Sequence, residues 1–575
     1  VRDFSGVAWN FRELNSSLNE PMSLPFRRHL LALLALFGAA ADSLATVAET
    51  VQPPTGRASY ILRQIIITEN ADSLKELDYD PTKGFVVLKV SVAAVEEAEM
   101  NRRLKAGENR VIDEQLLAAV AAVVENYLKS RGFPMAAALV PPQNIAAGAL
   151  RIVISLGRVR NVKFEGNRWF SESLLREKMR LERGGILQVS ELERSLAWTN
   201  NNSFRRLKLH VEPVAGTGEA DLFFKVQESF PLRFSAGYEN TGNAILGWDR
   251  YSAGLTYGNL WGQDHLISYQ EVSSHSMKLL RAQAVEYRAP LPWRHIVSVS
   301  GSLVRVNPTF LEGLFAQVGR NTSIDARYAI PFTKGSWEGE VTASLSAKRM
   351  NNNLEFGGVP ALTSAIEIFT GSAGLAAIRA DRLGRWVLSA TLTASPGNVT
   401  ARNNEEAFSE SRPGSRPRYL VGQFWAQRQT VLAGTVIHVA KLSTQVASAR
   451  LVPSEQFSLG GAGTVRGYEE RILSGDAGAW FSQELQKPLP PVTIGKRWPR
   501  LDSTMLVFWD YGRNLIRQPR PNEIRDSFLS SVGVGIRASL GSYLNASVDF
   551  AQQIERVELP GAAHNRLHVK VSFSY

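Results

Sequence analysis

The stretch Leu459–Tyr468, LGGAGTVRGY, is the part of the sequence whose residue types and spacing most suggest chemistry. Glycines fill three of its first five positions, so its backbone can adopt turns that are closed to residues with a Cβ. A phosphate-binding loop would need GxGxxG or GxxxxGK[ST] spacing. Here Gly463 is followed three residues later by Arg466, and no Lys-Ser/Thr pair follows. The glycines therefore do not indicate a phosphate site. Arg466, the one charged residue of the stretch, is either a hydrated surface charge or half of a specific pair.

The composition argues against several other kinds of site. Because there is no cysteine, the chain has no disulfide, thiol nucleophile or cysteine metal site. The eight histidines show no HExxH spacing, and no Ser/His/Asp set has motif support, so we expect neither an enzyme nor a cofactor. A net charge of +11 would suit nucleic acid, but there is no dense Lys/Arg run or helix-turn-helix pattern. The charge is expected to line a lumen or to face acidic partners.

A second motif, Phe508-Trp509-Asp510-Tyr511-Gly512, lies about 40 residues downstream of the first. The order of Val465-Arg466-Gly467-Tyr468 and this F-x-D-x-G pattern resembles the two signature motifs of two-partner secretion transporters (TpsB). These transporters belong to a superfamily of outer-membrane assembly and translocation barrels. In that family VRGY lies at the tip of a long loop folded into the barrel. The resemblance places such an inward loop at about residues 450–476.

Residues 230–575 alternate between apolar and polar or small side chains with a period of two. Leu232, Phe234 and Ala236 show the pattern at the start, and Leu544–Phe550 repeats it near the end. A transmembrane β-barrel needs one face for lipid and one for a wet interior. A soluble sandwich also alternates, but the secretory signal described below favours the barrel. The family's barrels have about 16 antiparallel strands, which leaves about 22 residues for each strand and its connection.

The same alternation orients the second motif. Met505, Val507 and Trp509 would face lipid, so Phe508 and Asp510 would face the lumen. The resemblance then implies that Arg466, carried inward by its loop, forms a bidentate ion pair with Asp510, with Tyr468 packed beside it. Its role would be to fix the loop in the pore rather than to catalyse. As a partly wet pair, it would contribute little to stability.

The last strand ends the chain on an aromatic residue. Val569, Val571, Phe573 and Tyr575 alternate with polar residues that include His568 and Lys570. We expect Val569, Val571 and Phe573 to face lipid, and His568 and Lys570 to face the lumen. The strand resembles the C-terminal signal by which outer-membrane barrels are recognised for insertion.

The N-terminal region reads as a secretory leader. Residues 22–45 are predicted to be a signal peptide, with Arg27 and Arg28 before the apolar run Leu30–Ala40 and a small-x-small cleavage site at Ser43–Ala45. As a helix the run would span about 16 Å, too short for a hydrocarbon core of ~30 Å. Residues 1–21 precede Met22 and are expected to be a start-site extension. Residues 46–86 are assigned to a linker, the region that holds a plug helix in TpsB relatives, although no long amphipathic helix is evident in it.

Two α+β modules are predicted between the linker and the barrel, at residues 87–157 and 158–229. The first combines a helix over Val111–Lys129 with a segment, YLKSRGF through SLGRV, that resembles the first POTRA domain of TpsB proteins. The second resembles another POTRA domain, and Ser190–Glu193 reads as a capping box for its second helix. POTRA domains can accept an extended client at a strand edge.

The resemblance implies an outer-membrane pore of a Gram-negative bacterium with its POTRA domains in the periplasm. It would bind an unfolded secreted exoprotein and export it through the barrel, and the folding of that partner outside would supply the energy. Outer-membrane lipid and, during insertion, the barrel-assembly machinery are the other expected partners; nucleic acid is not. A barrel-assembly insertase is the alternative within the superfamily, although two POTRA units favour secretion. A passive porin would explain the barrel but neither POTRA nor VRGY.

Overall fold

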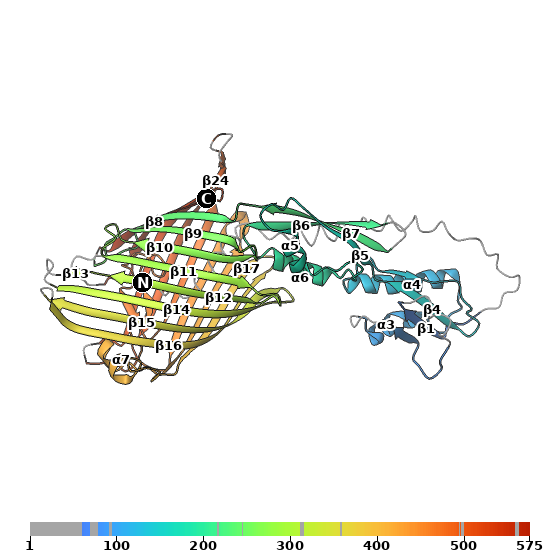
Figure 1. Ribbon diagram of the computed structural model, residues 1–575, viewed down its shortest axis with the longest axis horizontal. Helices are drawn as coiled ribbons and strands as arrows, with labels where there is room; N and C mark the ends of the chain where they lie inside the picture. Colours follow the sequence, from blue (N-terminus) through green and yellow to red (C-terminus); the bar gives the residue numbers. More distant parts are fainter. Residues whose placement is uncertain are drawn as a thin grey trace. The chain divides into compact units, whose positions relative to one another are not determined.

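The computed structural model describes residues 60–69, 79–90, 95–214, 218–243, 245–310, 315–356, 359–493, 495, 499–521, 523–557 and 563–575. The predicted start-site extension and signal peptide lie outside these residues. The chain divides into two compact units, which meet in the sequence at Ser229 and Phe230 and are described separately. Figure 1 labels the elements of both units.

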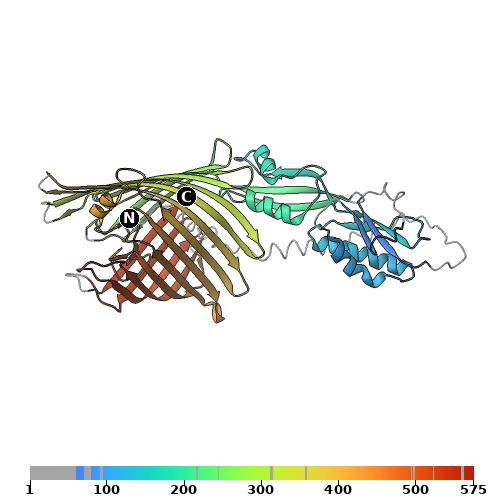
Figure 2. The ribbon, with the colours of Figure 1, turned by 90° about the horizontal axis from the view of Figure 1, so that it is seen from below.

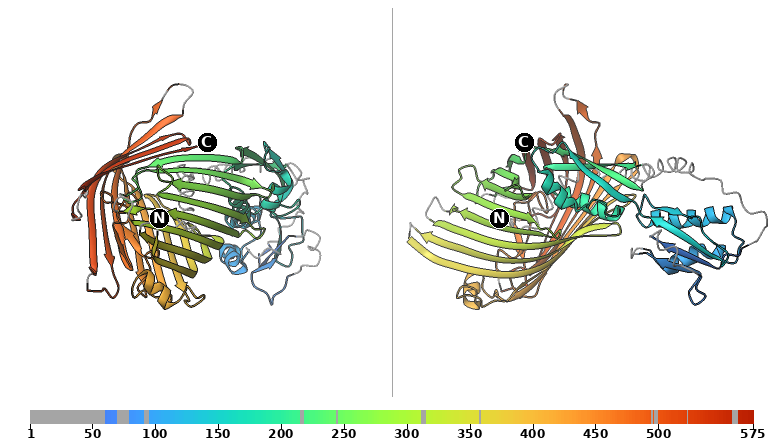
Figure 3. Two further views of the ribbon diagram at one scale, coloured as in Figure 1. Left: turned by 60° about the vertical axis from the view of Figure 1, so that its left-hand side comes forward. Right: turned by 45° about the vertical axis from the view of Figure 1, so that its right-hand side comes forward.

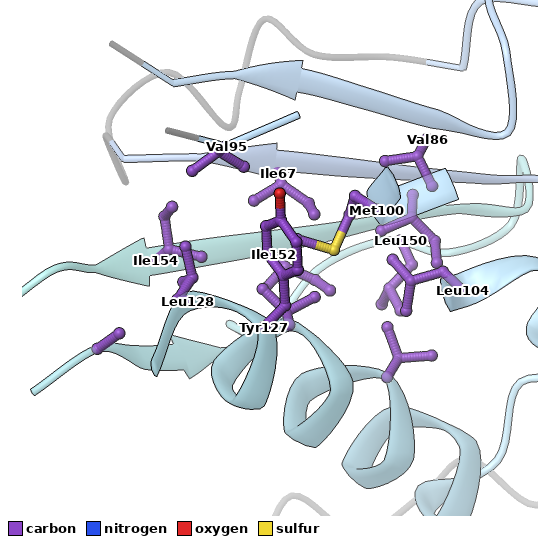
Figure 4. Packing of buried hydrophobic residues seen from close by; sticks show 14 of the residues in the cluster. Ile67, Val86, Val95, Met100, Leu104, Tyr127, Leu128, Leu150, Ile152 and Ile154 are labelled. Atoms are coloured by element: carbon purple, nitrogen blue, oxygen red, sulfur yellow. The ribbon is translucent and has the colours of Figure 1, made fainter. Parts of the chain in front are cut away.

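The first module of the N-terminal unit is a four-stranded sheet covered by helices. In spatial order its strands are β2 (Val86–Lys89), β1 (Gln64–Thr68), β4 (Ala149–Ser155) and β3 (Ala137–Leu139). Its helices are α3 (Glu97–Leu104), the short 3-10 turn η4 (Lys105–Gly107) and α4 (Glu114–Ser130). Figure 4 shows Met100 and Tyr127 from the helices packed against Ile67 and Ile152 of the sheet.

The predicted boundary of this module at residue 87 is too late. β1 lies inside the segment that the sequence assigned to a linker, yet it pairs in parallel with both β2 and β4. All five of its residues, QIIIT, are buried. A strand that is covered on both faces has a continuous apolar run rather than an alternation, and such a short run outside the recognised domain carries little signal. Helix α4 begins at Glu114, three residues later than predicted, because the Asp113 carboxylate accepts a hydrogen bond from Leu116 N at 2.7 Å.

Truncating β1 tests its place in the core. Ile65→Ala is expected to destabilise the first module by about 2–5 kcal/mol, because Ile65 is fully buried. Limited proteolysis of the full chain across a urea series would measure this as a lower midpoint for cleavage within the module. Ile61→Ala makes the same change at a side chain that is 45% exposed, and it should leave the midpoint nearly unchanged. Equal midpoints for the two variants would contradict a core role for β1.

The second module has a three-stranded sheet and two helices. Its strands lie in the order β5 (Arg158–Glu165), β7 (Glu219–Glu228), β6 (Arg205–Val214), and its helices are α5 (Glu172–Met179) and α6 (Val189–Thr199). The predicted capping box of α6 is not formed. The helix begins one residue before Ser190, and its N-cap, Gln188, makes no side-chain capping bond. Ser190 is therefore inside the first turn, where its hydroxyl cannot cap.

The two modules are joined by backbone hydrogen bonds. Val189 N donates to Gly132 O at 2.9 Å, and Leu187 N donates to Gly157 O at 3.0 Å. Met135 of the first module also packs against the core of the second. Only Leu156 and Gly157 separate β4 from β5. The start of the second module's helix α6 is thus tied to loops of the first.

The C-terminal unit is a closed antiparallel barrel of 16 strands. They are β8 (Leu232–Glu239), β9 (Arg250–Leu260), β10 (His265–Ser273), β11 (Leu280–Pro290), β12 (Ile296–Val306), β14 (Phe315–Lys334), β15 (Trp337–Phe356), β16 (Val359–Ala380), β17 (Gly384–Ser395), β18 (Tyr419–Val431), β19 (Ile437–Ala447), β22 (Ala477–Pro488), β24 (Arg500–Leu515), β25 (Asp526–Leu540), β26 (Leu544–Gln553) and β27 (Asn565–Ser574). Two short segments, β13 (Thr309–Phe310) and β23 (Val492–Thr493), pair with β14 and β24. The last strand, β27, pairs with the first, β8, from Lys570↔Glu239 to Ser574↔Ser235. Figure 2 and Figure 3 show the sheet from further sides.

The alternation along the strands separates an apolar outer face from a polar inner face. On β24, Met505 and Val507 are exposed, whereas Leu506 and Phe508, which alternate with them, are buried against the interior. Most connections at the end where β8 begins are short, such as 335–336 and 541–543. The long ones lie at the other end: 396–418, which contains α7 (Glu405–Ser411), and 448–476. None of the helices in the described part of the chain has the length and hydropathy needed to traverse a bilayer.

Candidate functional site

The connection between β19 and β22 folds back against the inner wall of the barrel. Its stem is a small antiparallel ladder of β20 (Phe457–Leu459) and β21 (Leu473–Gly475), and its tip carries the VRGY motif. The turn into the tip uses Gly460 at φ +101°, where a Cβ would collide with the Glu469 carbonyl. Leu459, Val465 and Tyr468 then pack in one apolar cluster with Trp480 and Leu529 of the wall.

Arg466 and Asp510 meet on the wall of the barrel. Arg466 Nε lies 2.7 Å from Asp510 Oδ2 and Nη2 lies 2.9 Å from Oδ1, which is the bidentate geometry of an arginine–carboxylate pair. The backbone N of Arg466 also donates to Oδ2 at 3.2 Å. Arg466 is 4% exposed and Asp510 is 0% exposed. The expectation of a partly wet pair is therefore wrong, because the folded loop itself covers both groups.

Further charged groups from four strands surround the pair. Glu484 Oε1 on β22 lies 3.1 Å from Arg466 Nη2, and Asp549 Oδ2 on β26 lies 3.7 Å from Nη1. Each of these carboxylates also forms a second ion pair. Lys441 Nζ lies 3.0 Å from Glu484 Oε1, and Arg537 Nη1 lies 2.6 Å from Asp549 Oδ1. Ser482 donates to Asp510 Oδ1 at 2.7 Å. We call these seven residues the loop-docking network: its three cations balance its three carboxylates.

The other residues of the F-x-D-x-G motif shape the surface that receives the loop. The guanidinium carbon of Arg466 lies 3.4 Å from the centroid of the Phe508 ring, a cation–π contact. A Cβ on Gly512 would lie 2.8 Å from Leu459 and 2.9 Å from Val465. Glycine at 512 therefore leaves the space into which the loop's apolar side chains fit.

Gly467 and Tyr468 attach the loop tip to the last strands. Gly467 N donates to His568 Nε2 at 3.3 Å, and Gln553 Nε2 donates to Gly467 O at 2.7 Å. The Tyr468 hydroxyl donates to Ser530 O at 2.8 Å and also contacts the Glu555 carbonyl. The tip thus touches β22, β24, β25, β26 and β27.

The stem of the loop has a second anchor at Asp476, which the sequence analysis did not identify. The Asp476 carboxylate is fully buried and accepts hydrogen bonds from Arg412 Nη1 at 2.5 Å, Leu451 N at 2.9 Å and Arg517 N at 2.8 Å. These donors come from three different connections. Ser482, Glu484 and Asp549 were not predicted from the sequence either. Their signal was available, since each is a polar residue at a lumen-facing position of an alternating strand.

The C-terminal residues follow the strand alternation. Val571, Phe573 and Tyr575 are exposed on the outer face, Val569 is partly exposed, and His568 is buried beneath the loop tip. Tyr575 exchanges two backbone hydrogen bonds of 2.9 Å with Phe234 of β8. The end of the chain thereby helps to close the barrel.

Comparison with known proteins relates this arrangement to a family. The family model for the haemolysin secretion/activation protein ShlB/FhaC/HecB matches residues 218–538, which is more than half of the chain. The chain belongs to this family. A second model, the ShlB-type POTRA domain, matches residues 84–157.

Individual relatives are distant in sequence. The chain is 22% identical to the outer membrane transporter CdiB of Dickeya dadantii over 367 residues, covering 63% of this chain and 64% of CdiB, slightly less than two thirds. It is 21% identical to the heme/hemopexin transporter protein HuxB of Haemophilus influenzae over 456 residues, covering 75% and 76%.

Solved structures share the fold. The structure of CdiB from Escherichia coli matches with a TM-score of 0.73 at 17% identity, covering 98% of both chains. BamA from Haemophilus ducreyi lacking POTRA domains 1–3 matches with a TM-score of 0.51 at 14% identity, covering 90% of this chain and all of that one. At these identities the likeness concerns the fold alone.

Proposed function

We propose that this chain is an outer-membrane transporter that recognises an unfolded secreted protein through its periplasmic modules and exports it through the barrel. The observation that carries the proposal is the buried loop-docking network, in a chain that belongs to a family described as secretion/activation proteins. A passive channel has no need to bury an arginine among three carboxylates under an internal loop. The network holds the loop at one place on the wall and has no catalytic task.

Removal and replacement of the chain test this function directly. Cells that lack the chain should retain one large secreted protein inside the envelope, and re-expression should restore its export. The second candidate function is that of a barrel-assembly insertase, because this chain shares its barrel fold with BamA. Its removal would instead deplete many outer-membrane barrels. Normal levels of other barrels together with loss of one exported protein would distinguish the transporter.

The free edge of the second module is the place where we expect the client to bind. β6 lies at the edge of its sheet, and the side-chain amide of Asn200 pairs with both Leu207 N (2.7 Å) and Leu207 O (3.2 Å). Backbone groups of alternate residues point to the same side of a strand. The backbone N–H and C=O groups of Leu209 and Val211 therefore also point outward at this edge, and the Asn200 side chain does not cover them. An extended client segment can add a strand there.

The opposite edge of the same sheet is already covered. β5 exchanges hydrogen bonds with residues 184–185, since Val159 N donates to Gly185 O and Gly184 N donates to Val159 O. Arg176 Nη2 also donates to Val162 O at 3.0 Å. β6 is therefore the more accessible edge for strand addition.

A proline at Val211 tests the edge. Val211→Pro removes an N–H that points away from the sheet, so β6 should keep its ladder with β7, as it does with the natural Pro213 two residues on. We expect export to fall about fivefold or more, because a client strand would lose one of its few backbone hydrogen bonds. Secreted partner in the medium is the measurement, and protease resistance of the module is the folding control. Val211→Ala retains the N–H and should export normally. Export at the wild-type level by a folded Val211→Pro chain would exclude this edge.

A further inference from the structure

Three arginines lie directly opposite one another across three neighbouring strands of the barrel. The strand register pairs Arg281 of β11 with Arg305 of β12, and Arg305 with Arg320 of β14. Arg349 of β15 follows on the diagonal, since it pairs with Thr322, two residues from Arg320. Figure 1 shows β11, β12, β14 and β15 side by side. We call these four residues the arginine row.

The arginine row is on the outer face of the barrel. Val285, Val299, Ile324 and Leu345 share the parity of the arginines on their respective strands and are 43–70% exposed. Side chains of the other parity, such as Ala282 and Val304, are buried toward the interior. Because successive side chains alternate between the faces, the arginines point toward the membrane.

The row lies at the outer boundary of the membrane. At the other end of β14, the hydroxyl of Tyr328 accepts from Trp293 Nε1 at 2.9 Å and contacts His295, an aromatic cluster typical of a bilayer interface. Tyr328 is eight positions along the strand from Arg320, which is about 27 Å along a strand and about 20 Å in height at a tilt of ~40°. The apolar band of such barrels is about 25 Å tall. β8 begins at the periplasmic end, so the row faces the outer leaflet.

The arginine row has more positive charge than its neighbours neutralise. Arg281 pairs with Glu271, with Nε 2.7 Å from Oε1. In the described part of the chain, Arg305 and Arg320 have no acidic side chain within salt-bridge distance. Arg349 is opposite Glu367 in the register, but Glu367 accepts a hydrogen bond from Thr400. Like charges directly opposite each other destabilise a sheet, and an anion bound between the arginines would relieve this repulsion.

We propose that the arginine row binds the phosphates of a glycolipid in the outer leaflet, namely lipid A. Arginine is well suited to phosphate because its planar fork donates two parallel hydrogen bonds. Strands are about 4.8 Å apart, so Arg281, Arg305 and Arg320 span about 10 Å, which allows more than one phosphate group to be held. The acyl chains would lie over the apolar residues below the row, with Val299 and Ile324 among them.

Native mass spectrometry of the full chain, titrated from detergent with bisphosphorylated lipid A, tests the site. The Arg305→Gln, Arg320→Gln double variant is expected to bind lipid A about tenfold more weakly, because it loses both arginines that have no acidic partner. Wild-type protein should show a similar loss with lipid A from which both phosphates have been removed. Arg513→Gln is the matched control: Arg513 shares the outward parity of Trp509 near the outer end of β24, but Asp526 already pairs with it. It should bind normally.

Two results would overturn the proposal. One is equal binding of phosphorylated and dephosphorylated lipid A by the wild-type chain, a comparison that needs no variant and so does not depend on folding. The other is unchanged binding by the double variant. Phosphatidylglycerol bound as tightly as lipid A would overturn the choice of ligand. Heat-modifiable migration in electrophoresis would verify that each variant is a folded barrel.

Discussion

Arg466→Ala is expected to reduce export of the secreted partner about tenfold or more, while the barrel still inserts, because breaking a buried ion pair from one side costs about 3–5 kcal/mol. The variant leaves Asp510, Glu484 and Asp549 facing only Lys441 and Arg537, beneath a loop that excludes water. The loop should leave the wall so that these carboxylates can be hydrated. The strands should remain, since their ladders do not include the loop.

Asp510→Ala should reduce export to a similar extent, because it leaves three cations of the network facing only two carboxylates. The double variant should then be less harmful than the sum of the two, because two cations would again face two carboxylates. We expect a coupling of about 2 kcal/mol in unfolding free energy from a double-mutant cycle. A parallel cycle on Arg513 and Asp526, whose side chains are 54% and 37% exposed, should give about 0–1 kcal/mol. Strictly additive effects of the Arg466 and Asp510 substitutions would show that they do not act as a pair.

Gly512→Val is the second substitution for which we expect a large effect. Its added atoms would occupy the space held by Leu459 and Val465, whose side chains lie 2.8 and 2.9 Å from the position of a Cβ. Overpacking of this kind costs about 1–3 kcal/mol, and moving the loop away relieves it. Valine favours the strand itself, so β24 should be preserved. We expect export to fall as far as in Arg466→Ala.

The release of the loop can be measured directly. The chain has no cysteine, so Thr464→Cys introduces a single reporter at a position that is 8% exposed. A membrane-impermeant maleimide should label it slowly in the otherwise wild-type chain and rapidly when combined with Gly512→Val or Arg466→Ala. Gly422→Val is the matched control, because a Cβ at Gly422 of β18 meets no atom within 4 Å. Rapid labelling by the control, or slow labelling with Gly512→Val, would contradict a docking role for Gly512.

Local chemistry made much of the barrel predictable. The partition of side chains between lipid and lumen repeats every two residues, so the orientation of Phe508 and Asp510 could be read from β24 alone. The family motifs supplied the expected contact of Arg466 with Asp510. The two α+β modules were likewise predicted from residue patterns together with a family resemblance. Their boundaries, however, depend on helix capping and strand pairing. Asp113 caps the start of α4, whereas α6 begins at Val189 without a side-chain cap.

Residue types and spacing alone indicate which side chains can face the lumen and that a glycine-rich loop carries one charge toward them. The packing of distant elements is what brings Glu484 and Asp549 to Asp510 around that charge, keeps the pair dry, and places β1 in the first sheet. It also decided that Arg281, Arg305 and Arg320 stand in one row. The physical reason is that alternation is a property of one strand, whereas register and burial depend on how distant strands and loops meet. A shift of one residue in pairing would put each of these side chains beside different neighbours.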